Sequence, residues 1–156
     1  MRFDQARALL AAFEREQVRC VLIGSMAMAA HGLVRATRDI DFFVAADPDN
    51  VERLKRALHA VFDDDSIDEI GSGDLAGAYP VIQYGPPDGD FTIDFVARLG
   101  DAFVYADVDA EDMVLDGIRV RVATPHMLYE MKRDTMRPQD RVDAENLRER
   151  FGLEER

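Results

Sequence analysis

The sequence predicts an α/β fold, in which helices alternate with short strands. Apolar residues recur at helical spacing in several segments, and short β-rich runs lie between those segments. The dipeptide Asp116-Gly117 between two apolar runs is a strong signal for a two-residue hairpin turn. A chain of 156 residues is long enough for one domain with its own core. We therefore expect residues 1–156 to form a single domain.

The first half predicts the order helix, strand, helix, strand, helix. An opening helix that ends near Glu16 follows from the three-and-four spacing of its apolar residues Ala6, Leu9, Leu10 and Phe13. Strands are expected over 18–23 and 39–45, with a short helix over 26–31 between them. The next helix should begin at Asp47-Pro48, because aspartate caps a helix and proline fits its first turn.

The second half predicts two hairpins and then two helices. Residues 63–77 are acidic and contain glycine, which predicts a surface loop. Strands over 81–84 and 91–97 should form one hairpin, and strands over 113–115 and 118–122 should form the other. Helices should follow from Pro125 to about Thr135 and from Pro138 to about Phe151, since the residue before a proline resists helical geometry. The sheet core is thus expected at 18–123 and the C-terminal helices at 124–156.

The composition excludes several classes of protein. Hydrophobic residues make up 47% of the chain and charged residues 32%, which is typical of a folded globular protein. The apolar runs fall short of the ~20 residues that a membrane span requires. The N-terminus lacks an apolar signal core, and the lone Cys20 excludes an intramolecular disulfide. We therefore expect a cytoplasmic protein that does not cross a membrane.

The charge balance restricts the partners. Nineteen basic and 31 acidic residues give a net charge of −12, which repels polyanions and argues against general nucleic-acid binding. A local basic patch of the size of a tRNA contact stays open as an alternative. Its members would be Arg119, Arg121, Lys132, Arg133, Arg137 and Arg141.

The most informative motif combines a glycine turn with three aspartates. Gly24-Ser25 directly follows a predicted strand, where glycine allows a close approach to a ligand and a helix start suits phosphate. Asp39 and Asp41 lie two apart on the next strand, so their side chains share one face, and Asp94 alternates with apolar neighbours in the same way. Three carboxylates beside a phosphate-binding turn are a typical site for Mg²⁺, with room for one or two ions. Asp94 is also the candidate base.

These residues resemble the minimal members of the DNA polymerase β-type nucleotidyltransferase superfamily, including abortive-infection-type toxin nucleotidyltransferases. That family has Gly-Gly or Gly-Ser at a helix start, Asp-x-Asp on the next strand and a third carboxylate on a later strand. The segment 35–42, with the sequence RATRDIDF, is similar to the family's approach to its metal strand. Met131-Lys132 followed by RPQD at 137–140 is similar to its C-terminal helical signature. The resemblance covers roughly residues 18–147.

The resemblance implies a nucleotidyltransferase-like fold, namely a mixed, mostly antiparallel β-sheet flanked by helices that close a nucleotide cleft. It implies transfer of a nucleoside monophosphate from a nucleoside triphosphate to an acceptor hydroxyl or phosphate, with Mg²⁺ or alternatively Mn²⁺ as the cofactor. The protein could be the toxin of a toxin–antitoxin pair, with an antitoxin-like protein as its partner. The implied catalytic and metal-binding residues are Asp39, Asp41 and Asp94, and the implied nucleotide-binding residues are Gly24, Ser25, Arg38 and Lys132.

Simpler interpretations exist for several of these residues. Arg35 or Arg38 could neutralise the aspartates of the 39–41 strand as a structural ion pair. Lys132 could reach solvent along its helix. The acidic pair Asp140 and Asp143 could either hold a neighbouring cation in place or be exposed. His31, beside Gly32, is expected to have a capping or core role.

Three classes of function stay open at this stage. The first is an active nucleotidyltransferase, the second a nucleotide-binding module without turnover, and the third an interaction protein whose acidic surface binds a basic partner. The acceptor of an active enzyme could be tRNA, a protein or a small molecule. A cationic small molecule such as an aminoglycoside would suit an acidic cleft.

Overall fold

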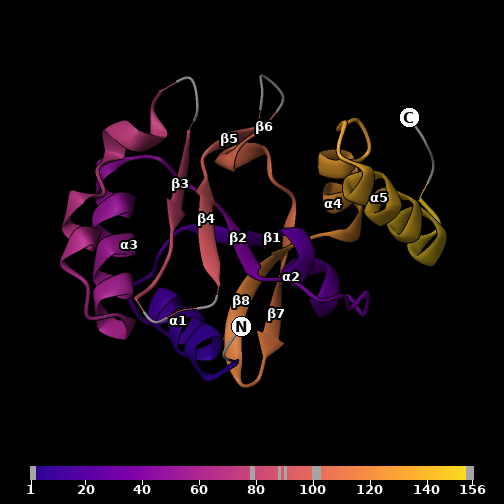
Figure 1. The fold of residues 1–156 in the computed structure, drawn as a ribbon. Coiled ribbons are helices and arrows are strands. Elements are labelled where there is room, and N and C mark those ends of the chain that lie inside the picture. Colours follow the sequence, from indigo (N-terminus) through magenta and orange to yellow (C-terminus); the bar gives the residue numbers. More distant parts are fainter. Residues whose placement is uncertain (1–2, 78–79, 88, 90, 100–102, 154–156) are drawn as a thin grey trace.

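The computed structural model describes residues 3–77, 80–87, 89, 91–99 and 103–153. A six-stranded sheet has the order β3-β4-β2-β1-β8-β7 and is flanked by helices (Figure 1). Its strands are β1 (Cys20–Ile23), β2 (Asp39–Val44), β3 (Val81–Tyr84), β4 (Thr92–Val96), β7 (Ala110–Leu115) and β8 (Ile118–Ala123). The pairs β1–β2, β3–β4 and β7–β8 are antiparallel, whereas β1–β8 and β2–β4 are parallel. The predicted mixed, mostly antiparallel sheet and both predicted hairpins are confirmed.

Five α-helices surround this sheet: α1 (Phe3–Arg15), α2 (Gly24–Ala30), α3 (Pro48–Val61), α4 (Pro125–Lys132) and α5 (Pro138–Phe151). As expected from the sequence, Asp47 caps α3 by accepting a hydrogen bond from the Asn50 amide at 3.1 Å. Thr124 caps α4 in the same way through the Met127 amide. Figure 1 shows α4 and α5 together at one side of the molecule, with α3 at the other.

Alternation along the central strands separates an apolar face from a polar one. On β2, Phe42 packs edge-on against Phe13 of α1, with ring centroids 5.0 Å apart. Phe42 also stacks on Phe95 of β4 at 6.0 Å. These three rings are buried and belong to the main core. The residues adjacent to Phe42 on β2 and to Phe95 on β4 therefore point to the opposite face of the sheet, where the aspartates lie.

Some segments differ from the sequence-based expectation. The predicted surface loop 63–77 contains two 3₁₀ segments, η1 (Asp65–Glu69) and η2 (Ser72–Leu75), and it buries Ile67 and Leu75 under the core. These two apolar side chains are isolated among acids, so no periodicity reveals them. A two-stranded sheet of β5 (Arg98–Leu99) and β6 (Phe103–Val104), followed by η3 (Tyr105–Asp107), was not predicted either.

The domain extent predicted from the sequence, 1–156, includes terminal residues outside the described ranges. Within those ranges, no helix combines the length and the apolar character that crossing a membrane requires.

Asn50 joins the start of α3 to the sheet. Its side chain is buried, and its Oδ1 accepts a hydrogen bond from the Arg19 amide at 2.7 Å. Its Nδ2 donates to the carbonyl oxygens of Arg19 at 3.1 Å and Ala45 at 2.8 Å. One side chain thus bonds three backbone groups next to β1 and β2. An apolar replacement would take this partner from the Arg19 amide and the Ala45 carbonyl, while the Arg19 carbonyl would keep the Ala45 amide at 3.2 Å.

We expect Asn50→Leu to lower the free energy of unfolding by about 2–4 kcal/mol, because buried backbone groups lose their partners. Urea unfolding followed by circular dichroism measures this change. The exposed neighbour Glu52→Ala is the control and should stay within ~0.5 kcal/mol of the wild type. Equal stabilities of Asn50→Leu and the control would contradict the structural role of Asn50.

Candidate active site

Three aspartates converge on the polar face of the sheet. The parallel register of β2 and β4 sets Asp41 directly beside Asp94 and Asp39 beside Thr92. Thr92 donates a hydrogen bond from its hydroxyl to the Asp39 carboxylate at 2.6 Å, which fixes the orientation of that side chain. The convergence predicted from residue spacing therefore has a structural origin in one pair of parallel strands.

Gly24 lies at the end of β1, where Ile23 pairs with Asp41 across the sheet. Its φ of +69° lies in the left-handed region that favours glycine. A Cβ atom at this position would collide with the Asp41 carboxylate, so any other residue would displace the aspartate. The following helix, α2, has only seven residues, and its dipole is correspondingly weak. Gly24 thus matters here for the close packing of the backbone against Asp41.

Asp41 is the most perturbed acid of the site. Burial, together with the neighbouring carboxyl groups of Asp94 and Asp39, raises the pKa of Asp41 from 3.8 to about 7, while Lys132 acts in the opposite direction. On Asp94, the Oδ1 atom is buried and has no hydrogen-bond partner in the described residues. Acids that repel one another and an acceptor without a donor favour a cation at this position.

The structure does not support the alternative of a structural ion pair. Within the described ranges, no Lys or Arg nitrogen lies within 4.0 Å of the carboxylates of Asp39, Asp41 or Asp94. Arg35 instead contacts Asp143 at 3.1 Å. Arg38 is exposed. The three carboxylates therefore concentrate negative charge without a cationic side chain in direct contact.

Lys132 connects the sheet face with the C-terminal helices. Its Nζ atom donates to Asp143 at 2.9 Å and to Asp140 at 3.4 Å, and its side chain is buried. Asp143 is also fully buried and accepts further hydrogen bonds from Gln139 and Arg35. Burial tends to raise the pKa of Asp143, but the hydrogen bonds from Lys132, Gln139 and Arg35 hold it below its ordinary value. Of the two sequence-based alternatives for the acidic pair, holding a cation is the one that the structure supports.

These groups enclose a polar cavity of about 160 Å³. Its lining consists of Gly24, Ser25, Arg35, Thr37, Asp39, Asp41, Asp94, Lys132, Arg137, Gln139 and Asp140. Six of the seven residues that the sequence implicated, all except Arg38, are therefore brought together. Arg35 and Thr37 were not singled out for nucleotide contact, although the RATRDIDF segment that carried the resemblance contains both.

The remaining candidates lie elsewhere. His31 has a buried side chain, and its Nε2 atom lies 2.8 Å from the Ala123 carbonyl oxygen, in line with the expected core role. The six cations of the suggested basic patch are divided between two cavities and the surface. Arg119 and Arg121 line a second cavity beside β8, whereas Lys132 and Arg137 line the polar one.

The oxygen donors of the three aspartates fit a divalent cation as an open site. In the described part of the chain, no group of three or more His, Cys, Asp or Glu side chains is arranged to hold a metal ion by itself. Mg²⁺, however, usually keeps waters and substrate phosphates in its shell and takes only one or two protein carboxylates. The unpartnered Asp94 oxygen and the raised pKa of Asp41 fit such an open site.

Comparisons with solved structures define the class of the fold as that of nucleotidyltransferases. ANT(2″)-Ia, solved with adenylyl-2″-tobramycin, is 13% identical, with a TM-score of 0.57 over 96% of this chain and 88% of that chain. A candidate nucleotidyltransferase from Thermotoga maritima is 17% identical, with a TM-score of 0.55 over 94% and 90% of the two chains. One from Helicobacter pylori is 18% identical, with a TM-score of 0.53 over 95% and 67%. A comparison with curated protein sequences found no match.

The chain belongs to the nucleotidyl transferase AbiEii toxin family of type IV toxin–antitoxin systems, whose family model matches residues 7–148. The match spans the glycine turn, all three aspartates and the Lys132 contact with α5. Membership agrees with the resemblance seen in the sequence motifs. It implies a nucleotide substrate and a toxin–antitoxin context.

The pKa of Asp41 has a consequence for stability. An unfolded aspartate titrates near 3.9, so between about pH 4 and pH 7 the folded state binds more protons than the unfolded state. The free energy of unfolding therefore falls as the pH rises through this window. We expect Asp41→Asn to be more stable than the wild type at pH 8 by about 1–2 kcal/mol, a value reduced for solvent screening, and less so at pH 5.

Urea unfolding at both pH values, in the presence of a chelator, measures this difference. Asp109→Asn changes an exposed aspartate with no ion pair in the described residues and serves as the control. It should match the wild type at both pH values. A stability gain for Asp41→Asn that is the same at pH 5 and pH 8 would show that Asp41 ionises normally in the folded protein.

Proposed function

We propose that this protein transfers a nucleoside monophosphate from a nucleoside triphosphate to an acceptor hydroxyl or phosphate. The observation that carries the proposal is the parallel register that sets Asp41 beside Asp94 on the polar face, with no cationic side chain of the described residues in contact. A bound Mg²⁺ or Mn²⁺ ion would neutralise the triphosphate and acidify the acceptor hydroxyl. Of Asp39, Asp41 and Asp94, one or two carboxylates at a time would hold such an ion, with Asp41 and Asp94 side by side.

The side chains of the cavity have distinct proposed roles. Lys132 and Arg35 bind phosphate oxygens, and Ser25 donates a further hydrogen bond. The Asp94 carboxylate accepts the proton of the acceptor hydroxyl. A new bond forms between the acceptor oxygen and the α-phosphorus, the bond from the α-phosphorus to its bridging oxygen breaks, and pyrophosphate leaves.

The size of the cavity suggests which part of the nucleotide it takes up. About 160 Å³ is well below the roughly 300 Å³ at which small-molecule pockets usually begin. We infer that the cavity holds the triphosphate end, while the sugar and base lie at its mouth near Arg137, which is 81% exposed. Few contacts would then be available to distinguish one nucleotide base from another.

The proposals for the acceptor and for the protein partner are supported by the comparisons with known proteins. ANT(2″)-Ia was solved with an adenylylated aminoglycoside, and a cationic small molecule would suit this acidic chain as an acceptor as well. A tRNA or a protein acceptor stays open. We propose further that the chain is the toxin of its pair, with an antitoxin-like protein as its functional partner.

Calorimetric titration with ATP, GTP, CTP and UTP, with and without Mg²⁺, tests the proposal. We expect metal-dependent binding that Asp39→Asn/Asp41→Asn abolishes, because an open cation site loses two of its carboxylates. The control is Asp63→Asn/Asp65→Asn, which alters the same Asp-x-Asp spacing on an exposed segment. It should bind like the wild type.

No binding of any triphosphate by the wild-type protein would contradict the proposed function. Binding without pyrophosphate release, over a panel of tRNA, protein and aminoglycoside acceptors, would favour a nucleotide-binding module instead. Release that continues in the double variant would remove the aspartates from the reaction.

A second prediction separates Arg35 from Arg38, the arginine implied by the sequence resemblance. Arg35 lines the cavity next to Lys132, whereas Arg38 is exposed and does not. We expect Arg35→Ala to weaken triphosphate binding about tenfold and Arg38→Ala less than about twofold, because only the first removes a charged donor from the cavity. Titration of both variants measures this, and urea unfolding checks that Arg35→Ala remains folded. Equal losses would assign the contact to both residues.

A further inference from the structure

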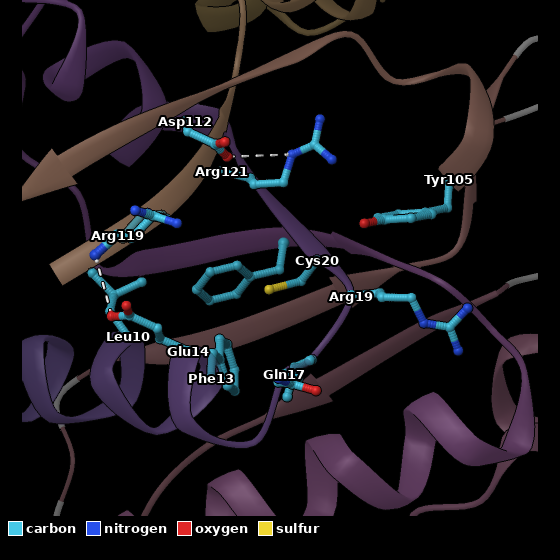
Figure 2. Close-up of a pocket in the computed structure, with 13 residues that line it drawn as sticks. Leu10, Phe13, Glu14, Gln17, Arg19, Cys20, Tyr105, Asp112, Arg119 and Arg121 are labelled. Atoms are coloured by element: carbon cyan, nitrogen blue, oxygen red, sulfur yellow. Dashed lines mark hydrogen bonds and ion pairs between the residues drawn. The ribbon is translucent and has the colours of Figure 1, made fainter.

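A second cavity, of about 320 Å³, lies beside β1 and β8, which pair at the single position Leu22–Val122 (Figure 2). Besides the residues discussed below, its wall includes Gln17 and Val18 after α1. The cavity shares no lining residue with the polar cavity. Its size falls in the range of cavities that bind small molecules.

The floor of this cavity is apolar. It consists of Leu10, Phe13, Cys20, Phe42 and Val120. Burial raises the pKa of the Cys20 thiol to about 12, so this sulfur behaves as a small apolar group and not as a nucleophile. The Phe42 and Phe13 rings are 0% and 4% exposed, so a ligand reaches the partly buried Leu10 and Cys20 that lie beside them. Such a surface suits a compact apolar body.

The rim is polar, and most of its charges already have partners. Arg19 makes a two-pronged contact with Asp47, both distances being 2.6 Å. Arg121 faces Asp112 at 3.8 Å. The Glu14 carboxylate accepts a hydrogen bond from the backbone amide of Arg119 at 3.2 Å. These contacts account for both acids that line the cavity.

Three side chains of the wall with N–H or O–H donors, one of them the Gln17 amide, make no hydrogen bond or ion pair within the described residues. The Arg119 guanidinium and the Tyr105 hydroxyl have no hydrogen-bond or ion-pair partner in the described residues. Figure 2 shows the hydroxyl end of Tyr105 directed toward Cys20, with Arg121 reaching in from β8. Burial raises the pKa of the Tyr105 hydroxyl, while Arg121 acts in the opposite direction, so this hydroxyl stays a hydrogen-bond donor. A ligand that matches the cavity must therefore supply acceptor oxygens.

We propose that this cavity binds a small organic anion, whose apolar body lies on the partly exposed Leu10 and Cys20 and whose oxyanion meets Arg119 and Tyr105. Carboxylates, sulfonates and phosphate esters share this chemistry. Arg121 can add a further charged donor, because its contact with Asp112 is long and exposed. The site is independent of nucleotide transfer, since Phe42 and the adjacent Asp41 point to opposite faces of β2.

Fluorescence titration with 1-anilinonaphthalene-8-sulfonate, an aromatic sulfonate, tests the proposal. The neutral N-phenyl-1-naphthylamine has a similar apolar body and serves as the paired probe. We expect Arg119→Ala/Tyr105→Phe to raise the Kd for the sulfonate about tenfold and to leave the Kd for the neutral probe unchanged. The control Arg141→Ala, an exposed arginine of α5, should change neither value.

Unchanged binding of the neutral probe shows that the double variant still folds with an intact cavity. Saturable sulfonate binding that the double variant retains would overturn the proposal. An equal loss of both probes would assign the cavity to neutral apolar molecules, and no binding of the sulfonate by the wild type would remove the site altogether.

Discussion

Repulsion between Asp41 and Asp94 is the interaction around which the polar face is organised. The parallel register of β2 and β4 holds the two carboxyl groups side by side, and burial prevents water from screening them fully. The opposite face of the same strands offsets this cost, because Phe42 and Phe95 stack within the core. Folding therefore stabilises an arrangement that is unfavourable in itself, and the proposed cation would relieve it.

The C-terminal helices supply the positive charge that the sheet lacks. Lys132 is buried, which is tolerated only because Asp140 and Asp143 accept its hydrogen bonds. Arg35 reaches the same Asp143 from the loop before β2, so one carboxylate positions two cations near the three catalytic candidates. The acids of α5 thus fix the Lys132 ammonium and the Arg35 guanidinium at the cavity, and the Arg35 Nε atom has no hydrogen-bond partner in the described residues.

Local patterns made much of this site predictable, and long-range contacts set the limit. The alternation in Asp39-Ile40-Asp41 fixes which face each side chain takes, and the caps at Asp47 and Thr124 depend on three neighbouring residues. Arg35 is different, since its direction is decided by Asp143, 108 positions away in the sequence. No periodicity carries that information, which is why the sequence pointed to Arg38, the arginine adjacent to the motif. The burial of Ile67 and Leu75 was not predicted for the same reason.

The two cavities show that lining chemistry, and not volume, distinguishes the candidate active site. The polar cavity is about 160 Å³ and the second about 320 Å³, yet only the smaller one combines repelling acids, a glycine whose replacement would displace Asp41, and the buried Lys132. Both cavities depend on β2, whose successive residues point to opposite faces. A substitution at Phe42 would therefore act on the second cavity and the core directly, and on Asp41 only through the backbone. β2 therefore contributes residues to two separate cavities, one on each face of the sheet.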